Sequence, residues 1–320
     1  MSDLSSAPSI GSIGAIVADA YNDRSKGFLP IVCENAIKID SLLRRVAGET
    51  TFGTRLNVRT LVAKSFLGPD AKPDELLEAL TPMSEEYFWK GARVTVEATI
   101  PVTGHPTVGF IAYCGANLEG RRRDREEVML ERDLLRRVEK MPWKAPREDL
   151  HVEILSPRPS DRDVADIVSI YLDRYTTYLT PFTSASVRNM AAGSQVVVIR
   201  DEHGRVASIC VSEIAHIPVP NAPPIHFVEI SDAATRKDCE GQGMYTAAKA
   251  ASIRFIRQAN PEAVITTEAR ANSIGVLRSN VNLGMKVAGH QPAHCVISAK
   301  SNEDVAQTSK YGNLVVFYVP

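Results

Sequence analysis

The pattern of hydrophobic and polar positions is clearest after about residue 150. Apolar residues spaced i, i+3, i+4, i+7 and i+8 predict a helix with one buried face, and Ser160 followed by Asp163 resembles a capping box at its start. Two runs rich in β-branched residues, 195–200 and 205–211, predict an antiparallel hairpin across Asp-Glu-His-Gly. The apolar positions of the helix are Val164, Ile167, Val168, Tyr171 and Leu172.

Strand-like and helical segments then alternate along the rest of the chain. A proline-rich loop over 218–224 leads into a strand at 226–231, which is followed by a helix over 246–255. Antiparallel hairpins combined with one βαβ crossover predict an α+β (mixed α/β) fold, because a doubly wound dinucleotide-binding fold would alternate strand and helix from its start. The other predicted elements are strands at 151–155, 263–268, 293–298 and 313–319 and a helix near 273–282.

The first 148 residues predict a smaller α+β unit, either separate from the rest or packed closely against it. Its last element is a highly charged helix from Arg121 to Lys140, with an apolar stripe that includes Met129 and Leu130. Acidic and basic residues are interleaved on this helix, which favours a solvated face over nucleic-acid contact. The other elements expected in this unit are strands at 13–18, 28–33, 56–64, 94–100 and 107–113 and helices near 35–47 and 73–90.

Length and composition are those of an ordinary globular protein. The chain has 320 residues, of which 44% are hydrophobic and 23% charged, and this is enough for two domains. We expect a loose tail over 1–12, an N-terminal α+β domain over 13–148 and a second domain over 149–320. A formal charge of -1 gives no global reason to expect nucleic acid or an anionic membrane as a partner.

The cysteines and the N-terminal residues indicate a cytoplasmic protein. Five widely spaced cysteines without a C-x-x-C pair argue for reduced thiols, and against zinc or a disulfide framework. His290 and His294 have no partners at ligand spacing, so we expect no metal site. No apolar run approaches the length of a membrane span, and the N-terminus lacks the basic start of a secretory signal.

Two glycines, Gly241 and Gly243, stand where the strand at 226–231 gives way to the next helix. The first turn of a helix leaves backbone N–H groups without partners and carries the positive end of the helix dipole, so it can bind an anion such as phosphate. By itself the pattern is a weak signal, because many glycines at such junctions merely turn the chain. Thr246 occupies the third glycine position of a dinucleotide fingerprint, which argues against a dehydrogenase.

Two motifs extend this picture. Glu240, Gly243 and Tyr245 occupy the three specified places of the pattern Gln/Arg-x-x-Gly-x-Gly/Ala, and about 40 residues later a helix opened by Asn272 ends at Gly284. In both motifs the C-terminal half resembles the GNAT superfamily of N-acetyltransferases, which hold acetyl-CoA in a V-shaped gap between two central strands. The resemblance therefore implies a GNAT-type fold over 149–320 and acetyl-CoA as co-substrate.

Within that superfamily the chain is most similar to β-lysine N-acetyltransferases. The run Val228–Thr235 is similar to their Glu-x-Thr-Asp-x-Ala-Thr strand, and Glu268–Gly275 is similar to their Ala-Arg-Ala-x-Ser-x-Gly element. Short N-terminal segments, such as Tyr21–Arg24 and Val96–Pro101, also have counterparts there. This likeness implies a primary amine of an amino acid or another small metabolite as the acceptor.

The resemblance also implies roles for individual residues. Glu229 lies on the strand beside the acyl site and is expected to accept the proton of the amine, directly or through water, although it could also be a structural carboxylate paired with a base. Asn280 stands where many members place a tyrosine that protonates the leaving thiolate; an amide can only hydrogen-bond the sulfur or the coenzyme. The expected coenzyme-binding residues are Ala233, Ala234, Thr235, Gly241, Gln242, Gly243, Met244, Tyr245, Thr246 and Asn272.

The acceptor pocket is expected beside the first helix of the C-terminal half. Tyr175, Tyr178 and Phe182 could wall an alkyl-ammonium chain, and core packing is an equal alternative for each. Arg270 could bind a substrate carboxylate or brace the end of its strand. Asp232 is expected to brace the following loop.

Two departures from the family pattern affect the coenzyme site. Glu240 places a carboxylate beside the pyrophosphate, which is unfavourable unless it points away, and Tyr245 is large where the family has a small residue. Arg236 and Lys237 could restore positive charge nearby. An N-acyltransferase with another acyl or amine specificity, and a catalytically degenerate protein that binds coenzyme A or an amino acid, therefore stay as alternatives.

The N-terminal half has three interpretations from sequence. It could be a second, inactive GNAT-like half, a lid over the acceptor site or a surface for forming a homodimer.

Overall fold

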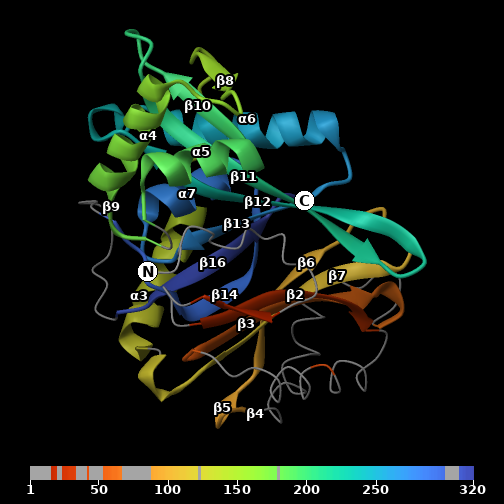
Figure 1. The fold of residues 1–320 in the computed structure, drawn as a ribbon. Coiled ribbons are helices and arrows are strands. Elements are labelled where there is room, and N and C mark those ends of the chain that lie inside the picture. The colour runs from red at the N-terminus through yellow and green to blue at the C-terminus, as the bar shows by residue number, and fades with distance from the viewer. Residues whose placement is uncertain are drawn as a thin grey trace, which may run out of the picture.

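A computed structural model describes residues 16–19, 24–33, 42, 53–66, 88–121, 124–178, 181–299 and 310–320. Its centre is a single mixed sheet that runs through both halves of the chain (Figure 1). In sheet order the strands are β1 (Ile16–Asp19), β2 (Arg24–Cys33), β3 (Arg55–Ala63), β7 (Val108–Asn117), β6 (Thr95–Pro101), β14 (Lys286–Cys295), β16 (Gly312–Tyr318), β13 (Val264–Arg270), β12 (Ala222–Thr235), β11 (Val206–Val219), β10 (Gln195–Arg200) and β8 (Val152–Ile154).

Helices cover both faces of the C-terminal part of this sheet. Helices α4 (Asp161–Arg174) and α5 (Ser184–Gly193) pack on the face that carries Val198 and Ile209. Helix α6 (Met244–Ala259) packs on the opposite face, against β10 to β13, and α7 (Ile274–Asn282) follows β13. The predicted mixed α/β class is confirmed by this arrangement of one large sheet between helices.

The start of α4 is as its sequence predicts, but one predicted core position is wrong. The Ser160 side chain accepts a hydrogen bond from the backbone N–H of Asp163, as an N-cap should. Val164, Ile167 and Tyr171 are buried, whereas Leu172 is 56% exposed. A residue one position beyond a buried one has rotated by about 100° around the helix, which turns Leu172 away from the sheet.

The predicted charged helix is α3 (Arg125–Glu139), and it joins the C-terminal half. Leu134, Leu135 and Val138 are buried against residues of α7 and β16. Met129 and Leu130, which the sequence places in the same stripe, are 66% and 56% exposed, so that part of the prediction is wrong. The helix begins after an Asp124 cap, and its buried face is narrower than its run of apolar letters.

The N-terminal strands agree with the predicted segments to within a few residues, and β7 continues to Asn117. The helix predicted near 35–47, apart from the helical Leu42, and most of the one near 73–90 lie outside the described residues. Within the second, the prediction is wrong at its end, because Phe88–Trp89 form strand β4, which pairs with β5 (Ala92–Arg93). A similar short pair joins β9 (Tyr175–Thr177) to β15 (Ser298–Ala299).

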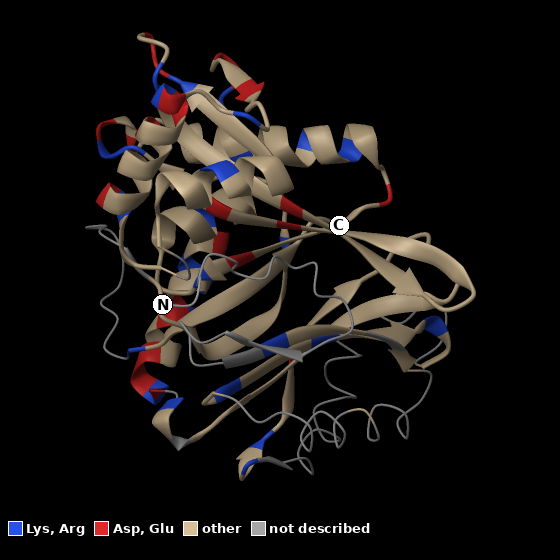
Figure 2. Ribbon diagram, in the orientation of Figure 1, with Lys and Arg blue, Asp and Glu red and all other residues tan. Residues whose placement is uncertain are grey.

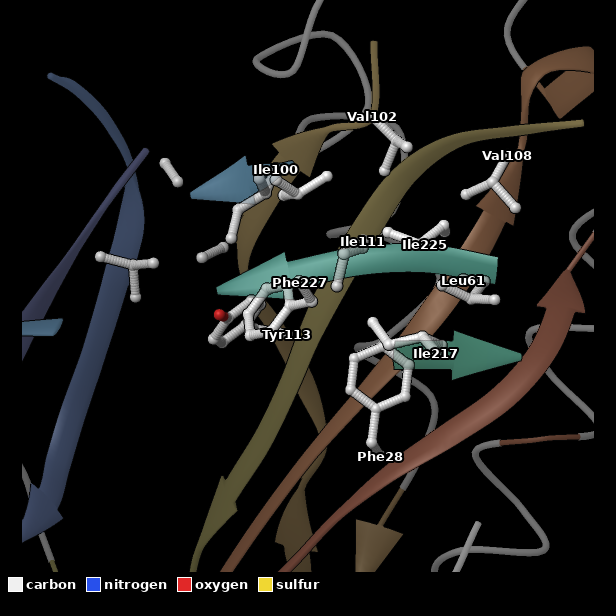
Figure 3. Packing of buried hydrophobic residues seen from close by; sticks show 14 of the residues in the cluster. Phe28, Leu61, Ile100, Val102, Val108, Ile111, Tyr113, Ile217, Ile225 and Phe227 are labelled. Carbon is white, nitrogen blue, oxygen red and sulfur yellow. The ribbon is translucent and has the colours of Figure 1, made fainter. Parts of the chain in front are cut away.

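The proline-rich segment at 218–224 is not a loop. Strands β11 and β12 extend through it as a long hairpin, with Val219 opposite Ala222 and the left-handed Asn221 in the turn. The far end of this hairpin lies over the N-terminal sheet, where Ile217, Ile225 and Phe227 pack against apolar residues of β2, β3 and β7 (Figure 3). Burial of these side chains outweighs the low strand propensity of proline.

The two halves meet where β14 lies beside β6. Gly289 pairs with Ala98, and a Cβ atom built on Gly289 would lie 2.0 Å from the carbonyl oxygen of Glu97. Only a residue without a side chain permits this approach. The predicted N-terminal unit is therefore packed closely against the C-terminal one, and the boundary near residue 148 stays a prediction.

Candidate functional site

A split between two parallel strands creates the site. β12 and β13 pair from Phe227 with Val264 to Glu229 with Thr266, and the ladder stops there. Beyond Glu229, β12 carries a bulge, because two steps along β11 correspond to three steps along β12 between Ser231 and Ala234. The strands separate beyond this point, so main-chain groups of β12 face a cleft instead of a neighbouring strand.

Three tyrosines hold the bulge in place. The hydroxyl of Tyr171 donates to the carbonyl oxygen of Asp232 over 2.6 Å, and that of Tyr175 donates to the carbonyl of Ala233 over 3.1 Å. The hydroxyl of Tyr178 donates to the Asp232 carboxylate. These contacts fix Asp232 at a φ of 45°, a left-handed conformation that most residues avoid. Asp232 therefore braces the bulge that contains it, and the expected bracing of the following loop stays a prediction.

The predicted aromatic residues divide into two groups. Tyr175 and Tyr178 line the cavity beside the bulge. Phe182 instead stacks on Tyr171 with ring centroids 4.2 Å apart and belongs to the core beneath α4 and α5, so the structure favours the packing alternative for this residue.

The glycine turn lies at the outer end of the cleft. Gly241 and Gly243 have φ values of 73° and 79°, which favour glycine, and Gly243 is the residue before the first turn of α6. The first backbone N–H groups of α6 therefore have no partner within the helix, and residues of this turn line the cleft. The expected anion site has the geometry that main-chain phosphate binding requires.

A cleft of about 700 Å³ extends from this turn. Its charged lining is mostly basic, with five cationic side chains and one carboxylate: Lys144, Arg174, Lys237, Arg270, Arg278 and Glu240. The predicted coenzyme-binding residues that line it are Ala233, Ala234, Thr235, Gly241, Gly243, Met244, Tyr245 and Thr246.

Two predicted coenzyme residues lie outside this lining. The side chain of Gln242 donates to the carbonyl of Asp238 over 3.2 Å, and Asn272 is buried next to α7. Arg236 also faces elsewhere, because it pairs with Asp201 and Asp238.

Glu240 does not leave an uncompensated charge in the cleft. It forms an ion pair with Arg174 at the end of α4, and both side chains line the cleft. The sequence suggested that Arg236 and Lys237 would restore positive charge here; Lys237 does line the cleft, but Arg174 is the direct partner. The carboxylate is therefore neutralised before any anion enters.

A smaller cavity of about 110 Å³ adjoins the cleft on its inner side. The two share a neck formed by Tyr175, Ala233, Tyr245, Arg270 and Val276. Figure 2 shows acidic segments on the C-terminal strands where these approach the N-terminal sheet. The charged residues that line the inner cavity, together with His294, are Glu213, Glu229, Asp232, Glu268, Lys249 and Arg270.

Arg59 of the N-terminal half contacts the predicted base. One nitrogen of its guanidinium lies 2.9 Å from a Glu229 carboxylate oxygen and 2.8 Å from one of Glu268. The same guanidinium lies 4.5 Å from the centre of the Tyr113 ring, and its side chain is 12% exposed. Glu229 is thus held as one partner of a mostly buried ion pair, and this contact favours the structural alternative for Glu229.

Glu213 is a second carboxylate that sequence reasoning missed. It stands directly opposite Glu229 in the β11–β12 ladder and accepts a hydrogen bond from Ser231 over 3.0 Å. Burial raises the pKa of Glu213 above its usual range, and the neighbouring Glu229 and Asp232 carboxylates raise it further. Burial also raises the pKa of Asp232, against the hydrogen bond from Tyr178. The inner cavity thus contains carboxyl groups that can take up protons near neutral pH.

Lys249 was also missed, and it contacts the predicted residue Asn280. Its ammonium nitrogen lies 2.6 Å from the side-chain oxygen of Asn280 and 3.1 Å from the hydroxyl of Thr267. Lys249 lines the inner cavity, whereas Asn280 is fully buried behind it and is not part of the lining of either cavity. The structure therefore places Asn280 where it holds Lys249, and not where it would contact a coenzyme directly.

Arg270 lines both cavities at the neck, and one of its nitrogens lies 3.3 Å from the Ser273 hydroxyl. This placement is compatible with either predicted role, binding a substrate carboxylate or bracing the end of β13. All five cysteines are buried, and none of them forms a disulfide. Within the described residues, no helix has both the length and the apolar character needed to cross a membrane.

Comparisons with known proteins give likeness in fold. No protein-family model and no curated protein matches the sequence. The chain is similar in structure to the ribosomal-protein-S18-alanine N-acetyltransferase from Escherichia coli. The match covers 53% of this chain and 93% of that protein, with 13% identity and a TM-score of 0.39. It is also similar in structure to a GNAT superfamily phosphinothricin acetyltransferase from Sinorhizobium meliloti in complex with AcCoA. That match covers 53% of this chain and 88% of that protein, with 15% identity and a TM-score of 0.40.

A third solved structure has a similar TM-score. Over 54% of its length the chain is similar to 93% of the ribosomal-protein-S5-alanine acetyltransferase from Vibrio fischeri, with 11% identity and a TM-score of 0.42. At such identities each is a likeness in the arrangement of strands and helices and says nothing about the substrate.

Proposed function

We propose that the protein is an acetyl-CoA-dependent N-acetyltransferase of the GNAT type that acts on a primary amine. The observation that carries this proposal is the two-part cavity: a basic cleft at a glycine turn and helix start, joined by a narrow neck to a cavity lined by carboxylates. An anionic coenzyme fits the first part and a cationic amine fits the second. The bond between them would then form at the neck.

The coenzyme would lie along the cleft. Its pyrophosphate would accept hydrogen bonds from the backbone at the start of α6, and its pantetheine arm would pair with the edge of β12 over Ala233–Thr235. Arg174 and Lys237 would add positive charge around the phosphates. When bound, the coenzyme supplies the thioester whose acetyl group is transferred.

The acceptor amine would enter the inner cavity. An alkyl ammonium has a pKa of about 10.4, so it must lose a proton before it attacks the thioester. We assign this proton to Glu213, whose raised pKa makes it a stronger base than an ordinary carboxylate. Glu229, fixed by Arg59, would bind and orient the ammonium. Tyr175 and Tyr178 would line its alkyl chain.

The acceptor we favour is an amino acid with a distant amine, of the β-lysine type. The sequence likeness of Val228–Thr235 and Glu268–Gly275 supports this choice, and Arg270 at the neck could bind the carboxylate of such a substrate. The protein would then act in amino-acid metabolism in the cytoplasm.

The test is thiol release from acetyl-CoA with a panel of diamines and amino acids that includes β-lysine. Wild-type protein should release thiol with at least one amine. Glu213→Gln should lower kcat by about 10²-fold, while Glu139→Gln, an exposed carboxylate on α3, should keep the full rate. If coenzyme A binds but no amine gives turnover, the enzyme proposal fails and the degenerate binding protein is favoured.

The same experiment separates the two carboxylates. Glu229→Gln should mainly raise KM for the amine, because its proposed role is binding. If instead Glu229→Gln lowers kcat and Glu213→Gln keeps it, Glu229 is the base, as the sequence suggests.

A further inference from the structure

Lys249 is a buried amine with few of the partners that a buried charge needs. Its side chain is on α6, it is 1% exposed, and its hydrogen-bond acceptors are the neutral groups of Asn280 and Thr267. Among the described residues, no carboxylate lies within salt-bridge distance of its nitrogen. Burying an ammonium without a counter-charge is costly, so such a residue needs an explanation.

The position of Lys249 relates it to the neck between the two cavities. Tyr245, which lines both cavities, lies one helical turn before Lys249, and the lysine nitrogen is 5.7 Å from the centre of the tyrosine ring. A thioester whose pantetheine arm follows Ala233–Thr235 would reach this neck with its sulfur. The amine would then stand near the place where negative charge develops as coenzyme A leaves.

Asn280 gives a second, independent reason to look at this amine. Its side-chain oxygen is 2.6 Å from the lysine nitrogen, and its own amide nitrogen has no hydrogen-bond partner among the described residues. An amide oxygen accepts a hydrogen bond from either protonation state of an amine and adds no negative charge. Asn280 thus orients Lys249 without binding its proton more tightly, as a carboxylate would.

We propose that the ammonium of Lys249 protonates the sulfur of coenzyme A as the thioester bond breaks, and that Asn280 is the positioning residue that aims it. This inference rests on the proposed N-acetyltransferase function. It also accounts for Asn280, which stands where many GNAT members have a tyrosine that protonates the thiolate. Here the proton donor would be Lys249, on the neighbouring helix α6.

Glu213 first takes one proton from the substrate ammonium and passes it to solvent. The neutral amine then attacks the thioester carbonyl carbon, a C–N bond forms, and the nitrogen gives its second proton to Glu213. The C–S bond breaks, the sulfur takes the electron pair together with a proton from Lys249, and free thiol leaves. Lys249 is then neutral and Glu213 is protonated, so one proton must pass between them through solvent to restore the starting state.

The acidity of Lys249 suits this task. Burial lowers the pKa of its ammonium to about 8, while the neighbouring Cys210 thiol acts in the opposite direction. At pH 7 the group is still mostly protonated, but it gives up its proton more readily than an exposed lysine. The other titratable or charged groups that face it, from its own helix and across the inner cavity, are Tyr245, Glu213, Glu229, Asp232, Glu268, Arg270 and His294.

The first test measures the thiol of bound coenzyme A and does not depend on turnover. Coenzyme A is bound to wild-type protein and to Lys249→Met, and thiolate absorbance in the ultraviolet is followed against pH. An ammonium beside the sulfur should make the bound thiol ionise at a pH about 1 lower in wild-type protein than in the variant. Arg254→Met, an exposed cation on the same helix, should behave as wild type.

The second test is the pH profile of thiol release from acetyl-CoA with β-lysine as acceptor. The wild-type rate should fall above about pH 8, where Lys249 loses its proton. Lys249→Met should be about 10²-fold slower at pH 7 and should lack this alkaline fall. Asn280→Asp, which puts a carboxylate beside the amine, should move the fall to higher pH.

Several outcomes would overturn the proposal. The bound thiol could ionise at the same pH in wild-type protein and in Lys249→Met, or the variant could keep the full rate at pH 7. An acetyl group found on Lys249 by mass spectrometry after incubation with acetyl-CoA would also overturn it, because an acetamide cannot donate the proton. If Lys249→Met does not fold, Asn280→Asp still decides, since an unmoved alkaline fall excludes Lys249 as its cause.

Failure of the proposed function looks different. Wild-type protein that binds coenzyme A but transfers acetyl to no amine would refute the enzyme. In that case the thiol titration would still show whether Lys249 stands beside the sulfur.

Discussion

Replacing Arg59 with methionine should destabilise the protein severely. Arg59 lies in the N-terminal half, and its two carboxylate partners, Glu229 and Glu268, lie 170 and 209 residues further along the chain. Methionine keeps most of the side-chain length and its contact with the Tyr113 ring. It removes the one guanidinium nitrogen that lies within 3 Å of both carboxylates. The substitution therefore removes the positive charge and keeps most of the side-chain packing.

The expected loss follows from burial. The three side chains are 12%, 12% and 14% exposed, so solvent screens the remaining carboxylates only in part. Removing one partner of a buried ion pair costs about 3–5 kcal/mol, because an uncompensated charge stays behind. Two carboxylates share this arginine, so we expect the free energy of unfolding to fall by at least the lower figure.

Equilibrium unfolding in urea, followed by circular dichroism, measures this loss. Lys64→Met, which removes an exposed cation directly after β3, is the matched control and should change stability by less than about 0.5 kcal/mol. Adding Glu229→Gln and Glu268→Gln to Arg59→Met should recover part of the loss, because neutral amides do not need the counter-charge. A loss below about 1 kcal/mol would be that of an exposed pair and would refute the reasoning from burial.

Two glycine substitutions test other parts of the structure. Gly289→Ala should lower the free energy of unfolding by about 1–3 kcal/mol, because its Cβ would lie 2.0 Å from the Glu97 carbonyl oxygen. Gly120→Ala, with open space around it, is the control. Equal stability of the two variants would contradict the close approach at Gly289. Gly243→Ala should cost about 1 kcal/mol because its φ is 79°, and it should weaken binding of coenzyme A in a calorimetric titration. Gly193→Ala, also in open space, should do neither, and unchanged coenzyme binding by Gly243→Ala would argue against the turn as the phosphate site.

Local signals in the sequence were enough to predict the glycine turn at the outer end of the cleft. Gly241 and Gly243 need their left-handed conformations within the same few residues that form the turn, so spacing alone indicates a strand, a turn and a helix start. The cap at Ser160 is local in the same way. The hairpin over 218–224 shows the limit of such signals, because its strands are stabilised by an apolar surface more than 100 residues away in sequence.

The inner part of the site depends on contacts that no local pattern contains. Arg59, Glu213 and Lys249 each look like a polar residue on a strand or a solvated helix until the sheet brings them together. One feature of the sequence indicates such contacts. Arg55 and Arg59 lie on one largely buried strand, and buried arginines are rare without partners. Which carboxylates they meet follows only from the order of strands in the sheet.

The pairing of β14 with β6 has a consequence for solubility. In the order of the sheet, β14 would be the outermost strand of residues 149–320 if the N-terminal strands were taken away. Its free N–H and C=O groups, on a largely buried strand, would then be a template for pairing with other chains, the hazard that natural proteins avoid by covering their sheet edges. Whatever else the N-terminal half does, it covers this edge of the sheet of residues 149–320.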